Sequence, residues 1–84
     1  MSKKQKLIKR LQSRPNDFTF DEATTLLSML GFSIRASGKT SGSRIAFSNK
    51  EGDLIRLHKP HPRNELKKYQ IDDVITTLKD LELI

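Results

Sequence analysis

Apolar side chains recur at helical spacing in two segments of the first part of the chain. The first segment is rich in lysine, and because Pro15 disfavours a helical conformation for the residue before it, a helix is predicted from Lys3 to about Ser13. The second begins with Thr19 and Glu22, which have the spacing of a capping box, and ends at Gly31. The two apolar stripes consist of Leu7, Ile8 and Leu11, and of Ala23, Leu26, Leu27 and Leu30.

A further apolar stripe near the C-terminus predicts a helix from about Gln70 to Leu81. Asp72 and Asp73 are then expected in its first turn, where the helix dipole favours negative charge. Lys67 and Lys68 would lie two or three residues before the helix, so that their ammonium groups and the helix N-terminus could act on the same phosphate. The stripe consists of Ile71, Val74, Ile75, Leu78 and Leu81.

Between these helices the pattern changes to a period of two, which indicates strands. Apolar and polar residues alternate over 32–36 and 44–48, and 53–58 again resembles a strand with one apolar face. Asn49 to Gly52 has the composition of a turn. The predicted order is therefore α-α-β-β-β-α. Short amphipathic helices and half-apolar strands favour an α+β fold, in which a three-stranded antiparallel sheet is covered by helices on one face.

The length of 84 residues allows one core, so a single domain is expected over 1–84, with 1–15 as an additional basic N-terminal helix. There is no cysteine, which excludes disulfides, thiolate nucleophiles and cysteine-ligated zinc. No apolar run is long enough to cross a bilayer and no signal-peptide pattern follows the first residues. We therefore expect a cytoplasmic protein with no membrane partner and no cofactor.

The net charge is +6, and the isoelectric point is near 9.9. An excess of positive charge attracts polyanions over long distances and through counterion release, so a nucleic acid is the expected partner. The alternative is a basic surface that only keeps the protein soluble. Aromatic residues are few and lie mostly in apolar segments, which argues against a platform for stacking single-stranded bases.

The two histidines, His58 and His61, lie at the end of the last predicted strand and in the loop after it. A histidine can transfer protons in both directions near neutral pH, because its unperturbed pKa is about 6.5. RNA carries its own nucleophile, the 2′-hydroxyl, so its cleavage needs a base, an acid and cations for the phosphate. The nearby cations are Lys59, Arg63, Lys67 and Lys68. We interpret the histidines as catalytic, with His61 in the leading role.

Two other interpretations of the histidines stay open. In the first, His58 is a half-buried residue at a strand end and His61 an ordinary loop residue between two prolines. In the second, both bind a metal ion, but no cysteine lies near them and Pro60 interrupts a regular helical pair of ligands. No metal is therefore predicted.

The segment from Gly38 to Arg44 combines two glycines with hydroxyl groups and two cations, which allow a loop to approach phosphate closely. Its candidate phosphate ligands are Lys39, Ser43 and Arg44, of which Arg44 opens a predicted strand. The segment lacks the spacing of a nucleotide-binding P-loop, so no NTP site is predicted. The alternative is an exposed hairpin loop without a ligand.

A larger pattern runs from Phe20 to Leu81. It consists of a helix ending in Leu30-Gly31-Phe32, a Gly42-Ser43 pair before a strand, a Pro-His element, and Glu65-Leu66-Lys67-Lys68 before an amphipathic helix. Taken together, these features resemble the HicA family, small toxins of bacterial and archaeal toxin–antitoxin pairs. The resemblance implies a double-stranded-RNA-binding-domain-like fold, metal-independent cleavage of mRNA by an endoribonuclease, and neutralisation by a HicB-like antitoxin.

One position departs from the family pattern. The family commonly places its catalytic histidine directly after the Gly-Ser pair, where this sequence has Arg44. Three hypotheses follow: His58 or His61 acts instead, Arg44 stabilises phosphate while another group moves protons, or the protein binds RNA without cleaving it. Besides the endoribonuclease, a non-catalytic RNA-binding module and a basic protein-interaction domain therefore stay open. The first helix also lies outside the pattern, as a dimer or antitoxin contact or only a basic arm.

Overall fold

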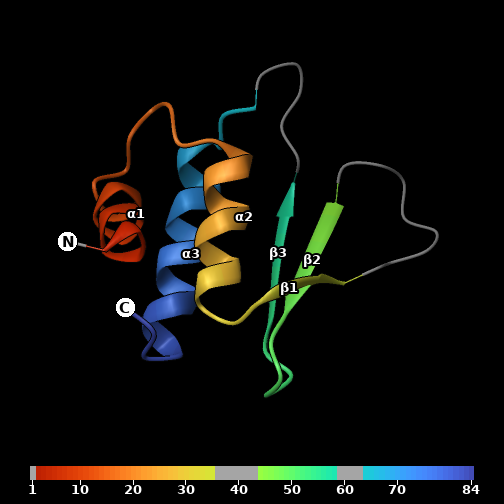
Figure 1. Cartoon of the computed structure of the whole chain (residues 1–84). Helices are drawn as coiled ribbons and strands as arrows, with labels where there is room; N and C mark the ends of the chain where they lie inside the picture. The colour runs from red at the N-terminus through yellow and green to blue at the C-terminus, as the bar shows by residue number, and fades with distance from the viewer. Residues whose placement is uncertain (1, 36–43, 59–63) are drawn as a thin grey trace.

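The structure is a computed structural model that describes residues 2–35, 44–58 and 64–84 (Figure 1). In chain order the elements are α1 (Lys3–Gln12), α2 (Phe20–Met29), β1 (Ser33–Arg35), β2 (Arg44–Ser48), β3 (Leu54–His58) and α3 (Lys68–Asp80). The α+β class and the order α-α-β-β-β-α are those predicted from the sequence. No helix in the described ranges is both long enough and apolar enough to cross a membrane.

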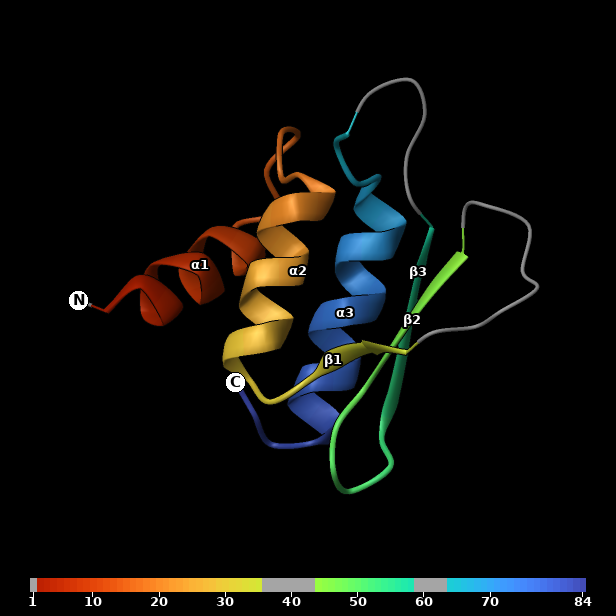
Figure 2. The same cartoon turned by 45° about the vertical axis from the view of Figure 1, so that its right-hand side comes forward.

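The strands form an antiparallel sheet in the order β1-β2-β3. Phe47 of β2 is paired with Ile34 of β1 and with Ile55 of β3. Directly opposed residues lie on the same face, and Phe47 and Ile55 are buried against the helices, whereas Ile34 on the edge strand is 55% exposed. Figures 1 and 2 show α2 and α3 on one side of the sheet and the other side open, as predicted.

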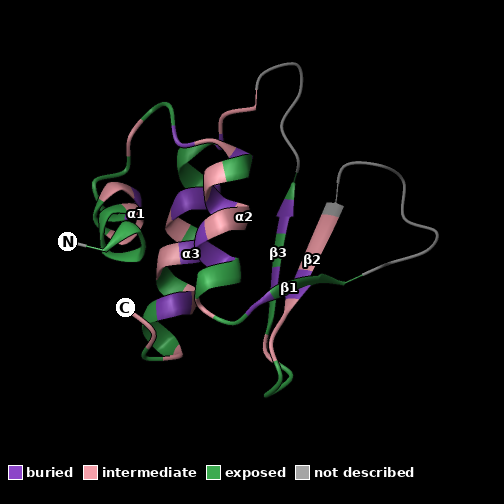
Figure 3. Ribbon diagram, viewed as in Figure 1, coloured by how far each residue is buried: buried purple, intermediate pink, exposed green. Residues whose placement is uncertain are grey.

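The core lies between the helices and the inner face of the sheet, and the buried residues that form it are purple in Figure 3. Phe20 of α2 packs against Phe47, with ring centroids 6.2 Å apart. All three helices, β2, β3 and the connecting segments contribute. The core residues are Leu11, Phe18, Phe20, Ala23, Leu26, Leu27, Phe32, Phe47, Ile55, Leu57, Leu66, Ile71, Val74 and Leu78.

The segments that lead into α2 and α3 pair with each other. The Phe20 N–H donates to the Asn64 carbonyl oxygen and the Leu66 N–H to the Phe18 carbonyl oxygen, each at 2.7 Å. This pairing holds the N-termini of α2 and α3 side by side. Figure 1 places both N-termini at the same end of the molecule as the start of β2 and the end of β3. The elements that carry the candidate site therefore converge at one end.

An ion-pair cluster attaches α1 to the start of α2. Arg10 donates from Nε to Glu22 Oε2 at 2.7 Å and from Nη2 to Asp17 Oδ1 at 3.0 Å, while Leu11 beside it is buried in the core. The hydrogen bond from Arg10 lowers the pKa of the Glu22 carboxyl group, against a smaller opposing effect of burial. Glu22 also accepts from the Thr19 N–H at 3.1 Å, which completes the predicted capping box.

A second ion pair links the end of α1 to α3. Arg14 Nε lies 2.6 Å from Asp72 Oδ1, and Arg14 Nη2 donates to Asp72 Oδ2 at 2.9 Å. Arg14 precedes Pro15 and has a φ of 53°, so the chain leaves the right-handed helical region there, as predicted. With its apolar face in the core and two ionic attachments, α1 is docked on the rest of the protein and is not a free basic arm.

Three boundaries differ from the prediction. α3 begins at Lys68 rather than Gln70, because the Gln70 and Ile71 N–H groups both donate to the Lys67 carbonyl oxygen. Its first turn therefore contains no acid, and the predicted position of the two aspartates was wrong. β1 begins after Phe32, whose N–H donates to the Leu27 carbonyl oxygen, and β3 begins after Asp53, whose N–H donates to the Asn49 side chain in the turn.

Candidate functional site

Arg44 and His58 are paired on the neighbouring strands β2 and β3, at the end of the sheet where the two helix N-termini lie. Arg44 is the first residue of β2 and His58 the last of β3, and the strand register pairs them. The His58 N–H donates away from β2, to Oε1 of Gln70 at 2.8 Å. The pair is therefore of the non-hydrogen-bonded kind, in which the two Cα atoms approach to about 4.5 Å.

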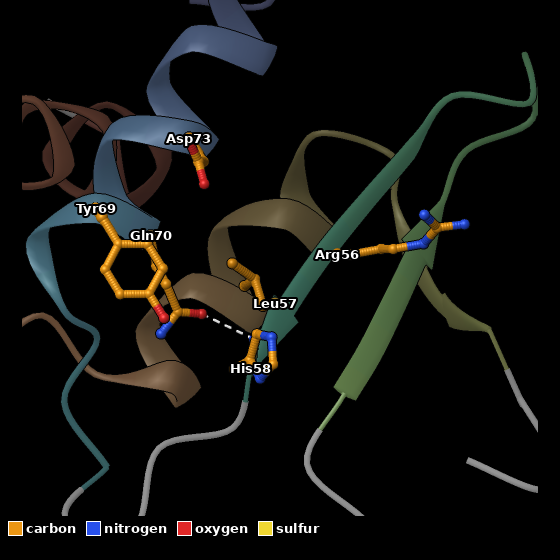
Figure 4. Close-up of a pocket in the computed structure, with 6 residues that line it drawn as sticks. All are labelled: Arg56, Leu57, His58, Tyr69, Gln70 and Asp73. Carbon is orange, nitrogen blue, oxygen red and sulfur yellow. Dashed lines mark hydrogen bonds between the residues drawn. The ribbon is translucent and has the colours of Figure 1, made fainter. Parts of the chain in front are cut away.

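Gln70 joins α3 to the edge of β3 (Figure 4). Its side chain is 5% exposed, and its Oε1 accepts a backbone N–H that an edge strand would otherwise leave without a partner. The sequence places Gln70 at the start of the last helix but gives no sign of this bond, because the two residues are twelve positions apart. The bond fixes the backbone of His58 while its side chain stays exposed.

A pocket of about 260 Å³ lies between β3 and the first turns of α3. Figure 4 shows that its walls come from these two elements. Tyr69 contributes an aromatic side chain that is 57% exposed, beside the imidazole-bearing end of β3. An exposed aromatic ring here was not expected from the low aromatic content. The residues that line the pocket are Arg56, Leu57, His58, Tyr69, Gln70 and Asp73.

The predicted lysine pair lies at the N-terminus of α3. Lys67 is the N-cap and Lys68 the first helical residue, and both are exposed. No side chain caps this terminus and its first turn holds no acid, so its N–H groups and the two ammonium groups favour an anion. Apart from His58 and the two lysines, Arg44 is the one predicted site residue that the structure describes, and only its backbone is described. Those outside the described residues are Lys39, Ser43, Lys59 and His61.

The described residues contain no group of three or more histidine, cysteine, aspartate or glutamate side chains placed to hold a metal ion. The pocket brings His58 and Tyr69 together with the carboxylate of Asp73, and Lys67 and Lys68 directly precede Tyr69 at the N-terminus of α3. These groups are able to exchange protons and to hold phosphate. The arrangement therefore suits a phosphate-containing ligand.

The family model described as "HicA toxin of bacterial toxin-antitoxin" matches residues 20–83. The chain belongs to the HicA toxin family. The HicA match begins at the first residue of α2 and includes every later element, which leaves α1 outside it. No curated protein and no solved structure matches the chain.

The pairing of Arg44 with His58 can now be compared with the family's residue pattern. The position directly after the Gly-Ser pair, where HicA toxins commonly carry histidine, is residue 44 in this chain. Its partner across the sheet is one of the two histidines of the sequence. His58 is therefore paired, on the neighbouring strand, with the position at which the family commonly has its histidine.

Proposed function

We propose that the protein is a toxin that cleaves mRNA. In this proposal His58 performs the proton transfer for which HicA toxins commonly use the histidine after Gly-Ser. The observation that supports this is the pairing of Arg44 with His58. Moving an imidazole from β2 to the paired position on β3 displaces it by about one strand spacing, roughly 4.8 Å. An RNA bound at this end needs only a small shift to meet the imidazole on the other strand.

The reaction follows from the chemistry of RNA. The 2′-oxygen attacks the adjacent phosphorus, the bond from phosphorus to the 5′-oxygen breaks, and a 2′,3′-cyclic phosphate and a 5′-hydroxyl result. One group removes the proton of the 2′-hydroxyl and another protonates the leaving 5′-oxygen. We assign these two roles to His58 and His61, and no step requires a metal ion.

Cations hold the phosphate while these protons move. Lys67 and Lys68 act together with the N-terminus of α3, where the dipole favours negative charge. Arg44 starts β2 on the same rung as His58, and its guanidinium stabilises the phosphate in place of the missing histidine. The remaining phosphate ligands of the proposal are Lys39, Ser43 and Lys59.

The toxin is neutralised by a HicB-like antitoxin, according to the same proposal. An antitoxin that blocks cleavage has to cover the end of the molecule formed by β2, β3 and the start of α3. Because this end is basic, an acidic antitoxin surface would compete directly with RNA. Co-purification of the protein with the product of a neighbouring HicB-like gene, and its release by RNA, would test this part.

The catalytic part is tested by incubating the purified, antitoxin-free protein with labelled single-stranded RNA in the presence of EDTA. We expect cleavage by the native protein and none by His58→Ala or His61→Ala, with binding to 2′-O-methyl RNA retained in both. Lys79→Ala, at the far end of α3, serves as the control and should cleave normally. Intact RNA with the native protein would instead favour a non-catalytic RNA-binding module, for which the arginine at position 44 is the supporting observation.

A further inference from the structure

Two arginines lie in one row across the three strands, on the face of the sheet that the helices leave open. Arg56 is exposed and alternates along β3 with Ile55 and Leu57, which are buried against the helices. The register pairs Arg56 with Ala46 of β2, and Ala46 with Arg35 of β1. Since directly opposed residues share a face, Arg35 and Arg56 belong to the same open face. We refer to these two residues as the arginine rung.

The geometry of the arginine rung leaves both guanidinium groups accessible. Two strand spacings separate the Cα atoms of Arg35 and Arg56 by about 10 Å, and only the methyl group of Ala46 lies between them. Both arginines are exposed, and Figure 4 shows Arg56 extending across the sheet towards β2. A ligand on the open face can therefore contact both at once.

Within the described ranges, neither arginine of the arginine rung forms an ion pair with a carboxylate. β1, β2 and β3 contain no acidic residue, and within the described ranges the ion pairs involve Arg10 and Arg14 instead. The acids lie in the helices, the turns and the segments between them, and Asp73 of α3 lines the same pocket as Arg56 without forming an ion pair with it. The positive charge of the open face is therefore not compensated within its own layer.

We propose that the arginine rung binds the phosphate backbone of single-stranded RNA and directs the strand towards His58. His58 lies two residues beyond Arg56 on the same face, which is about 7 Å along β3. Arginine suits this role because its planar guanidinium donates two parallel hydrogen bonds to a phosphate. The inference rests on the proposed function for the identity of the ligand as RNA, but backbone binding itself does not require cleavage.

The composition of the open face favours nucleic acid over a protein partner. Protein interfaces are built around apolar and aromatic cores, whereas nucleic-acid interfaces are more polar and more positively charged. The outward positions of the described strands carry no aromatic residue, and their one large apolar side chain, Leu54, lies at the opposite end of β3 from His58. The open face therefore lacks the apolar centre that a protein partner would contact.

The test measures binding of a fluorescent single-stranded DNA oligonucleotide by anisotropy at several salt concentrations. DNA has no 2′-hydroxyl and stays intact whether or not the protein is a nuclease. Arg35→Gln/Arg56→Gln removes both rung charges, and Lys6→Gln/Lys9→Gln removes the same charge from the exposed side of α1. Loss of two phosphate contacts should weaken binding about 25-fold at about 0.1 M salt and reduce the salt slope by about 1.4.

The control pair should change binding far less, and both double variants should unfold at the temperature of the native protein, since all four side chains are exposed. Arg35→Lys/Arg56→Lys retains the charge without the planar fork and should bind with intermediate affinity. Native-like binding by Arg35→Gln/Arg56→Gln would overturn the inference, and so would an equal loss of affinity in this variant and in the control Lys6→Gln/Lys9→Gln. In the second case only diffuse charge matters. A native protein that binds DNA through the rung but leaves RNA intact would refute the nuclease and keep the binding site.

Discussion

The side-chain oxygen of Gln70 accepts a 2.8 Å hydrogen bond from the backbone N–H of His58 and thereby joins the first turn of α3 to the open edge of β3. This bond connects two parts of the candidate site, the histidine at the strand end and the helix N-terminus with its lysine pair. It also satisfies a donor that the sheet cannot pair. The buried side chain of Gln70 therefore adds a specific hydrogen bond to the core packing that positions β3 relative to α3.

Replacing Gln70 with methionine should destabilise the protein, because Met keeps the length and apolar volume but removes the acceptor. An unsatisfied donor in a partly buried position costs about 1–3 kcal/mol. The free energy of unfolding, measured with a chemical denaturant, should fall by that amount for Gln70→Met. Gln12→Met, on the exposed side of α1, is the matched control and should stay close to native. Equal stability of both variants and the native protein would show that this bond contributes nothing.

Tyr69 should act through its ring rather than its hydroxyl group. Its side chain is 57% exposed beside the pocket that contains His58, and stacking of a base on such a ring contributes about 1–3 kcal/mol. Tyr69→Ala should therefore weaken binding of 2′-O-methyl RNA by about 5- to 100-fold, and Tyr69→Phe should leave it nearly unchanged. If both variants lost the same affinity, the hydroxyl group would be the contact and stacking would be wrong.

Replacing Arg14 with glycine should not destabilise the protein, despite the loss of an ion pair. Arg14 has a φ of 53°, a conformation that costs a residue with a side chain about 1 kcal/mol relative to glycine. Its pair with Asp72 is about half exposed and contributes about 0.2–1 kcal/mol. Arg14→Gly should be as stable as the native protein or slightly more so, whereas Asp72→Ala should be slightly less stable. A clear loss of stability in Arg14→Gly would mean that the ion pair outweighs the backbone strain.

The cluster around Glu22 should make stability depend on pH in the acidic range. The hydrogen bond from Arg10 lowers the pKa of Glu22 in the folded protein, relative to about 4.3 when unfolded. The resulting stabilisation is complete above the unfolded pKa and is lost as the pH falls through the folded pKa. Glu22→Gln keeps the capping-box geometry without the charge. The difference in unfolding free energy between the native protein and this variant should shrink from about pH 6 to pH 3; a constant difference would contradict the assigned cause.

Local signals in the sequence were sufficient for the order of elements. Thr19 and Glu22 form the predicted capping box, and Asn49 and Gly52 close the predicted turn, because each depends on residues three or four positions apart. The sequence pattern predicts the start of α3 two residues too late, since nothing in Lys68 or Tyr69 distinguishes a helix from the segment before it. Boundaries of this kind are decided by the neighbouring pairing of 64–66 with 18–20.

Only part of the site followed from residue types. Residue type alone points to His58, Lys67 and Lys68, because histidine suits proton transfer and lysine suits phosphate binding. The pairing of positions 44 and 58 can be found only from the strand register, and so can the alignment of Arg35 and Arg56 on either side of Ala46. A period-two pattern tells which residues share a face of one strand, but it does not tell which residues of two strands are opposed. Tertiary structure was therefore needed to connect the missing family histidine with His58.

The most direct test of this connection exchanges the residues at the paired positions 44 and 58. His58→Arg alone should abolish cleavage of single-stranded RNA in EDTA, and adding Arg44→His to it should restore cleavage, because the imidazole then returns to the position common in HicA toxins. The thermal unfolding temperature of each variant establishes that it is folded. Restored cleavage is the result that we predict. Native-like cleavage by His58→Arg, or a folded exchange variant that leaves RNA intact, would contradict the assignment of His58 as the replacement for the family histidine.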